Sequence, residues 1–397
     1  MIQKIGITAS FDDLPQEVAD EKSAKKYLSD VSRGSKNITL PFYRTGDDIK
    51  FVLPIVPGVP MIAFPIIHAA KYASKVSVCG PKALEELVRR TADAIDASGK
   101  VVFVEEGENP RYTQTLENCM SIADNGEMMG FILGDVVLAY NLQGFLSDSD
   151  TLDDDAVWDF NARENVFPHE EFFSRNYYDH LIANGKKVSI KEPNMYHFNR
   201  KGLVGAKKIL KAAYENRKGG QIVYGFIGTV FKIAFSEPGL FLKVFNYINK
   251  REHNPHPVEV FERIMNRHLM TQGKLRIKVE HTDPWRVRDI DGFSDLKFYQ
   301  TIFSEAKRKG MLDDVYPYGK ELAAVREAIA PVAANYPALA DFDGYLKEKI
   351  DRINKHLGAN PTSVKRIFCL QAGDRIGIAL EYLRNQYMPD YKRSLSA

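Results

Sequence analysis

The sequence predicts an α/β protein with a mainly parallel sheet flanked by helices, followed by a C-terminal helical appendage. Two observations lead to this expectation. Short apolar runs alternate with helical patterns in residues 1–140, and from residue 304 onward only helical patterns occur. Strands that alternate with helices indicate βαβ crossovers, and such crossovers place neighbouring strands parallel to one another.

Four short runs rich in apolar and β-branched residues predict the strands of this sheet. They are KIGITAS (residues 4–10), KVSVCG (75–80), KVVFVEEG (100–107) and GFILGDVVLAY (130–140). The ligand crevice of an open α/β sheet lies beyond the carboxyl ends of its strands. We therefore expect Gly80, the EEG after Val104 and Asp135 to lie along one edge.

Helical patterns lie between these runs. Residues 81–99 carry apolar side chains at helical spacing, with a proline at the start and a glycine at the end. Residues 113–126 predict a further helix, and MIAFPIIHAAKYA (61–73) predicts a buried one. The preceding segment is broken by three prolines, which favours loop or edge structure. The polar residues 11–39 predict an excursion with one short helix.

The pattern is less regular after Leu152. Residues 186–215 and 274–303 each suggest a strand, a turn and a helix, the second helix beginning near Leu296 with Ser294 or Asp295 as its cap. We therefore expect two regions, an α/β domain in residues 1–303 and a helical region in residues 304–397. The helical region carries no catalytic motif, so packing on the core, capping of the site and assembly into a homo-oligomer all stay open.

Composition excludes several classes of protein. The chain has 397 residues, of which 44% are apolar and 27% charged, as in ordinary globular proteins. A formal net charge of +2 gives no reason to expect a nucleic-acid partner. The three cysteines show no CxxC spacing, so neither a disulfide framework nor a zinc site is indicated, and reduced thiols in the cytoplasm are expected.

No signal peptide or transmembrane segment is expected. The N-terminal apolar stretch is too short for a signal peptide. The longest apolar segment, Gln221–Phe235, is interrupted by Lys232 and falls short of the roughly 20 residues that a spanning helix needs. An ordinary core segment is the simpler interpretation, and a membrane-surface contact or an apolar substrate is left open.

Acidic residues provide the first candidate site. Asp135 follows a glycine inside an apolar run, where an unpaired carboxylate would be costly to bury. Asp289 and Asp291 stand between a predicted strand and a predicted helix that other residues can cap. Two carboxylates facing one crevice suit Mg²⁺, which usually takes one or two protein carboxylates together with substrate phosphate. Turn or capping roles are the competing interpretation.

Three further features could contact a phosphorylated substrate. Lys50 stands beside the proline-rich loop and could neutralise phosphate, and Lys191 could do the same elsewhere. The hydroxyls and amides of TQTLEN (residues 113–118) could hydrogen-bond a base. Each has a plainer interpretation, as an exposed lysine or as a helix cap. None is specific alone.

Taken in order, the motifs resemble the GT-A-like nucleotidyltransferases, which include sugar-phosphate nucleotidyltransferases and molybdenum-cofactor guanylyltransferases. KFVLPIVPGVPMIAFPI is similar to the family's K-x-L-L-P-V-x-x-K-P-M-I segment, and ILGDVVL to its L-x-G-D strand end. IKEPNMYHFN resembles the family's E-K-P…G-x-Y-x-F region, and RDIDGFSDL its D-x-D-T-x-E-D-L segment. The resemblance covers roughly residues 1–300 and implies a Rossmann-like, GT-A-like sheet.

The resemblance implies a role for each matched residue. It implies transfer of NMP from an NTP to a phosphorylated acceptor, such as a sugar or polyol phosphate, with Mg²⁺ as cofactor and pyrophosphate as product. The implied catalytic residues are Lys50 and Asp135, and the implied metal ligands are Asp135 and Asp291, with Asp289 in reserve. The implied nucleotide-binding residues are Ser10, Gly34, Lys50, Gly80, Thr113, Gln114, Thr115 and Gly134. The implied acceptor-binding residues are Lys191 and Glu192.

Two departures from the family keep other functions open. The glycine-rich loop with arginine that follows the family's first strand is absent after IGITAS, and SRGSKN (residues 32–37) is the nearest substitute. Val59 replaces the lysine of the family's K-P-M. One alternative is a GT-A glycosyltransferase that holds metal with Asp148 and Asp150 of SDSD, although this acidic run reads more simply as a solvated loop. The other is a degenerate nucleotide-binding protein.

Overall fold

The computed structural model of the chain describes residues 2–10, 15–32, 49–107, 111–139, 142–148, 152–162, 178–183, 186–191, 194–211, 256–280, 289–290 and 292–357. No helix among these residues is long and apolar enough to cross a membrane.

The strands form one large sheet and one small one. The large sheet has the order β11-β8-β9-β7-β10-β6-β1-β4-β5, and β12 pairs with β7 off this path. The small sheet pairs β2 with β3. The strand bounds are β1 Lys4–Thr8, β2 Pro54–Val56, β3 Val59–Pro60, β4 Lys75–Gly80, β5 Val101–Glu105, β6 Met129–Leu133, β7 Ala156–Ala162, β8 Tyr178–Ala183, β9 Lys186–Lys191, β10 Met195–Phe198, β11 His256–Pro257 and β12 Leu275–Glu280.

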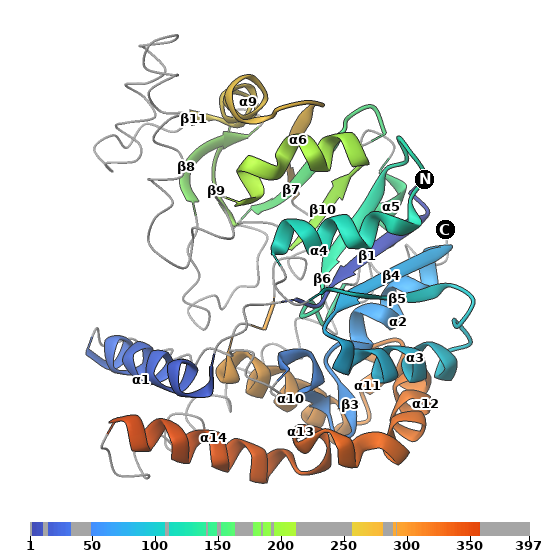
Figure 1. Ribbon diagram of the computed structural model, residues 1–397, viewed down its shortest axis with the longest axis vertical. Helices are drawn as coiled ribbons and strands as arrows, with labels where there is room; N and C mark the ends of the chain where they lie inside the picture. The colour runs from blue at the N-terminus through green and yellow to red at the C-terminus, as the bar shows by residue number, and fades with distance from the viewer. Residues whose placement is uncertain are drawn as a thin grey trace.

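Helices cover both faces of the large sheet (Figure 1). The α-helices are α1 Gln16–Ser32, α2 Ala63–Tyr72, α3 Glu85–Ala94, α4 Tyr112–Cys119, α5 Leu142–Ser147, α6 Arg200–Leu210, α9 Val258–Ile264, α10 Phe293–Arg308, α11 Leu312–Val315, α12 Gly319–Ile329, α13 Pro337–Ala340 and α14 Phe342–Leu357. Short 3₁₀ turns are η1 Lys50–Val52, η2 Lys82–Leu84, η3 Met120–Ile122 and η10 Ala330–Asn335, and η9 Met265–Leu269 is a π-helical turn.

The four strands β6, β1, β4 and β5 are parallel throughout, and β10 joins β6 antiparallel. Side chains of β1 alternate between two cores, as the strand period of two requires. Ile5 and Ile7 face the core under α2 and α3. On the other face, a side chain at Gly6 would collide with Cys119 of α4 and with Phe131. The predicted α/β fold with its mainly parallel sheet and flanking helices is therefore confirmed.

The C-terminal helices share the core under α2 and α3. Tyr316, Leu322 and Val325 are buried in the same apolar cluster as Ile5 of the first strand. Helix α10 runs through residues 303 and 304 without a break. The expected boundary between the two regions therefore falls inside a helix, and the described residues on its two sides form one core.

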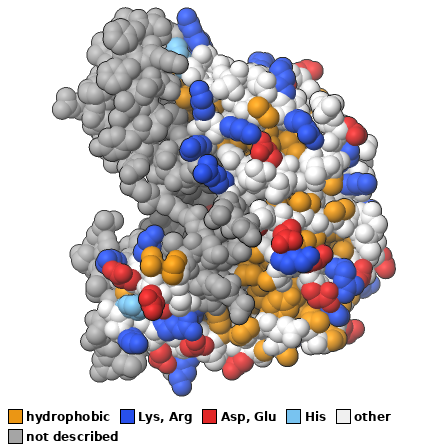
Figure 2. Space-filling view, in the orientation of Figure 1, with side chains coloured by type: hydrophobic (Ala, Val, Ile, Leu, Met, Phe, Trp, Pro, Cys, Tyr) orange, Lys and Arg blue, Asp and Glu red, His pale blue; other side chains and the backbone are white. Residues whose placement is uncertain are grey.

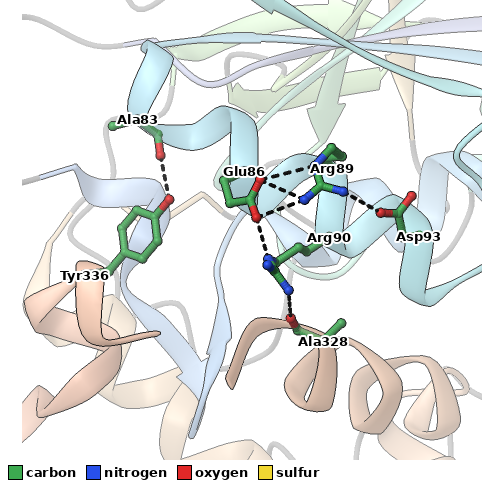
Figure 3. Close-up of polar contacts among 7 residues, drawn as sticks. All are labelled: Ala83, Glu86, Arg89, Arg90, Asp93, Ala328 and Tyr336. Atoms are coloured by element: carbon green, nitrogen blue, oxygen red, sulfur yellow. Dashed lines mark hydrogen bonds and ion pairs between the residues drawn. The ribbon is translucent and has the colours of Figure 1, made fainter. Parts of the chain in front are cut away.

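Polar contacts also attach these helices to α3 (Figure 3). Arg90 donates to the Glu86 carboxylate at 2.6 Å on one side and to the carbonyl of Ala328 at 3.0 Å on the other. Hydrogen bonds from Arg89 and Arg90 lower the pKa of the Glu86 carboxyl. The Tyr336 hydroxyl donates to the carbonyl of Ala83 at 3.0 Å, in the turn that follows β4.

Three local expectations need correction. The helix in residues 11–39 is not short, since α1 spans 17 residues. Strand β6 ends at Leu133, so Asp135 lies in a turn and not inside a strand. Helix α10 begins at Phe293, ahead of the expected start, because Gly292 is its N-cap and the Asp295 carboxylate accepts from the Gly292 N–H at 3.1 Å. Asp295 therefore supports the helix start from the third position and is not the cap itself.

His68 lies at the centre of the aromatic contacts between α2 and the C-terminal helices. Its ring packs edge-on against Tyr316 and Tyr318, with centroids 5.4 and 5.0 Å away. The side chain is completely buried, and this burial lowers its pKa from 6.5 to about 3. His68 is therefore an uncharged core residue at neutral pH.

We predict that His68 makes the protein sensitive to acid. The unfolded chain takes up a proton at this ring below pH 6.5, whereas the folded protein does not until about pH 3. The free energy of unfolding should therefore fall as the pH drops through this window, by about 2 kcal/mol between pH 7 and pH 5 for this one group. Urea unfolding at several pH values should show a smaller acid loss in His68→Phe. The exposed His356→Gln should behave as wild type, and an unchanged slope in His68→Phe would contradict the assignment.

Candidate active site

The carboxyl ends of the parallel strands meet along one edge of the sheet. Backbone hydrogen bonds join the residues just beyond these ends: Ala9 N–H to the Cys79 carbonyl at 2.8 Å, Glu106 N–H to Gly80 at 3.0 Å, and Gly134 N–H to Thr8 at 2.8 Å. This is the edge at which an open α/β sheet offers its ligand crevice. Gly80 and Asp135 lie there, as the sequence predicts, and Ser10 and Gly134 lie there too.

Asp135 has a cation partner at this edge. Its Oδ2 is ion-paired with Lys50 Nζ, and the two side chains are only 9% and 10% exposed. A hydrogen bond from Val136 N–H to the Leu133 carbonyl, 3.1 Å long, closes the turn that carries Asp135. The carboxylate that is costly to bury unpaired is thus neutralised by a lysine 85 residues earlier in the chain.

Lys50 is held in place by the segment that follows it. It begins the turn η1, and backbone hydrogen bonds from Met61 to Leu53 (2.9 Å) and from Ile62 to Phe51 (3.1 Å) fasten this turn to the start of α2. Phe51 is 3% exposed, which fixes the turn in the core. The proline-rich segment after Lys50 therefore forms a buried turn and the short two-stranded sheet of β2 and β3, and not a helix.

Gly134 permits the contact between the turn and the strand end. A Cβ at this position would lie 3.0 Å from the Phe51 ring, 3.0 Å from the Thr8 carbonyl oxygen and 3.2 Å from Ile62. Protein atoms thus fill the space beside the Gly134 Cα. Because glycine has no side chain there, η1 can approach Asp135. Its role in nucleotide binding stays a prediction.

Two buried polar side chains at this edge were not singled out from the sequence. Thr8 is 3% and Asn194 5% exposed, and within the described part of the chain neither Thr8 Oγ1 nor Asn194 Nδ2 has a hydrogen-bond partner. Both flank Leu133, because Thr8 is its neighbour in β1 and Asn194 accepts its N–H at 3.1 Å. Buried polar atoms are normally satisfied, so these two are candidates for ligand contacts. A threonine ending an apolar strand was the signal available for Thr8.

Glu106 is a further buried acid at the edge. It follows β5 and is 4% exposed. The sequence places the EEG of residues 105–107 at this edge, without indicating which of its acids turns inward.

The three residues expected to contact a base lie at the start of α4. Thr115 is buried, and its hydroxyl donates to the Arg111 carbonyl at 3.3 Å within its own helix. Gln114 is exposed and donates to Asn118 at 3.0 Å. Thr113 is half-buried. Thr113 and Gln114 therefore face outward more than Thr115 does.

Several predicted residues cannot be placed. Gly34, Glu192 and Asp291, and Asp150 of the alternative site, lie outside the described residues. Lys191 is the last residue of β9, and its side chain is not among those that the structure describes. Asp289 is half-buried. Asp148 is ion-paired with Lys278 of β12, and these side chains are 31% and 19% exposed.

Solved structures are similar to this chain, whereas no family model and no curated protein matches it. Three similar solved structures are a hypothetical transferase from Thermus thermophilus, an inositol-1-phosphate CTP transferase from T. maritima and a putative glucose-1-phosphate thymidylyltransferase from Bacillus anthracis.

Their identities to this chain are 14%, 9% and 15%, with TM-scores of 0.41, 0.35 and 0.33. The alignments cover 75%, 79% and 52% of this chain and 100%, 96% and 75% of the others. All three are described as transferases, two of them as nucleotidyl-transferring ones, which is the class that the sequence motifs resemble. At these identities and TM-scores they do not assign this chain to a family.

We predict that the space beside Gly134 is essential to the packing of the site. Gly134→Ala should lower the free energy of unfolding by about 1–3 kcal/mol, because the added methyl group overpacks the contact with Phe51 and the Thr8 carbonyl. Urea unfolding provides the measurement. Gly99→Ala is the matched control, since a Cβ there meets nothing within 4 Å. Equal stabilities of the two variants would refute the close contact.

A second prediction concerns the ion pair. Lys50→Met leaves the Asp135 carboxylate buried without its cation, which should cost about 3–5 kcal/mol of unfolding free energy. The double variant Lys50→Met/Asp135→Leu removes both charges and should recover most of this loss. Should the single and double variants unfold at the same urea concentration, the pair does not hold the turn.

Proposed function

We propose that this chain is a Mg²⁺-dependent nucleotidyltransferase that transfers NMP from an NTP to a phosphorylated small-molecule acceptor and releases pyrophosphate. The observation that supports it best is the pairing of Lys50 with Asp135 at the carboxyl edge of the parallel strands. Metal-assisted phosphoryl transfer needs a carboxylate to hold the metal ion and a cation to balance phosphate charge. Asp135 and Lys50 would supply one of each at this edge.

The chemistry needs charge neutralisation and positioning more than a covalent nucleophile. The acceptor's phosphate oxygen attacks the α-phosphorus of the NTP, and the bond to the pyrophosphate oxygen breaks. Lys50 would lie beside the phosphates and balance part of their charge. Thr113 and Gln114 at the start of α4 would contact the base, and Lys191 and Glu192 would contact the acceptor.

Asp135 fits Mg²⁺ by its donor chemistry, because the ion prefers oxygen ligands and needs only one or two protein carboxylates when phosphate supplies others. Within the described residues no group of three or more acidic, histidine or cysteine side chains is placed to hold a metal. Asp135 would therefore share the ion with Asp291, or with Asp289, and with the substrate. Bound Mg²⁺ would polarise the phosphate and stabilise the leaving pyrophosphate.

The direct test is pyrophosphate release from each NTP with Mg²⁺ and a pool of sugar and polyol phosphates. Asp135→Asn should lower the rate by about 100-fold or more, because it removes a charge that acts on the transition state. Asp93→Asn, at an exposed position of α3, should remain near wild type. Thermal unfolding of each variant confirms that the fold persists.

Other outcomes would replace the proposal. Pyrophosphate release by Asp135→Asn at the wild-type rate would remove its central residue. Turnover of a nucleotide-sugar without pyrophosphate, lost in Asp148→Asn, would indicate the glycosyltransferase. Stabilisation by NTP with no turnover of any acceptor would indicate a nucleotide-binding protein.

A further inference from the structure

The solvent face of α6 carries only cations apart from one half-buried valine. The helix buries one side, namely Gly202, Leu203, Gly205, Ala206, Ile209 and Leu210. On the other side the exposed residues are Arg200, Lys201, Lys207, Lys208 and, just past the helix end, Lys211. At 3.6 residues per turn these five cations fall within an arc of about 120°. We call them the α6 basic face.

This face looks outward from the sheet. Figure 1 draws α6 in front of the strands, and Figure 2 shows Lys and Arg side chains gathered over the same part of the molecule. The loop beside α6 adds Lys274, whose side chain is 63% exposed. A backbone hydrogen bond from Thr271 to the Gly205 carbonyl, 3.1 Å long, holds this loop to the helix.

Helix stability does not account for this arrangement. Cations favour the last turn of a helix, which explains Lys207 and Lys208, but they are unfavourable in the first turn, where Arg200 and Lys201 lie. Like charges four residues apart, as in Lys207 and Lys211, also repel. The face therefore concentrates positive charge against local helix preference.

Acidic neighbours among the described residues balance the face only in part. Lys201 pairs with Asp155 at 3.1 Å, and Lys207 pairs with Glu117 of α4. Lys274 pairs with Asp154 at 2.9 Å. In the described part of the chain, no acid lies within ion-pair distance of Arg200, Lys208 or Lys211. The described acids thus leave three of the five cations of the face without an ion pair.

The sequence around the face shows which polyanion it suits. Residues 200–235 contain eight cations and one acid, Glu215, in a chain whose net charge is only +2. The same stretch ends in the apolar run Gln221–Phe235. Basic residues next to apolar ones are typical of segments that bind the surface of anionic membranes, whereas phosphate binding on nucleic acid needs no such apolar run.

We propose that the α6 basic face binds the surface of a bilayer rich in anionic lipid. Binding is peripheral, and the attraction comes from cations near negatively charged headgroups. Each such cation contributes about fivefold to partitioning at moderate salt. Arg200, Lys208 and Lys211, which have no acidic partner among the described residues, contribute most.

The test is sedimentation of the full chain with vesicles of phosphatidylcholine alone or mixed with phosphatidylserine. The protein should sediment with the anionic vesicles only, and high salt should release it. The variant Arg200→Gln/Lys208→Gln/Lys211→Gln should bind about 100-fold more weakly. The matched control, Lys297→Gln/Lys307→Gln/Lys309→Gln, neutralises two exposed lysines of α10 and the exposed lysine just past its end, and it should bind as wild type.

Three results would overturn the proposal. They are equal sedimentation with neutral and anionic vesicles, undiminished binding by the α6 variant, and retention on duplex DNA with no binding to either vesicle. Thermal unfolding of both triple variants establishes that each is folded. Because the assay contains no NTP, its outcome is independent of whether the chain transfers nucleotides.

Discussion

The ion pair between Lys50 and Asp135 is the contact on which the arrangement of the candidate site depends. It joins the turn before α2 to the turn after β6, and the two paired residues are 85 positions apart in the sequence. Moving two charges out of water is costly, and their attraction compensates only when the geometry is good. The contact between Phe51 and Gly134 supplies that geometry, because any larger residue at position 134 would push the two turns apart.

Local sequence information was enough for the strands and helices around this contact. The run KVSVCG became β4 with the predicted bounds, because β-branched residues and a terminal glycine act within a few residues. The edge position of Gly80 and Asp135 followed from the parallel order of the strands. The partner of Asp135 did not follow, since no local pattern tells a buried lysine from an exposed one.

Contacts between distant segments account for what the sequence did not reveal. Helical periodicity identified the C-terminal helices, but only packing shows that Tyr316 and Tyr318 enclose His68 of α2. Likewise, no local pattern shows that His197 is buried in the core, with Nδ1 3.2 Å from the Asp159 carboxylate and Nε2 3.1 Å from the Phe145 carbonyl.

Helix α4 connects the candidate site with the α6 basic face. Helix α4 begins beside the edge that carries Asp135 and packs against α6, where Glu117 pairs with Lys207. A bilayer held against α6 would therefore lie one helix away from the predicted base-binding residues. An acceptor whose phosphate is attached to an apolar group could then reach the site while its apolar part stays in the membrane.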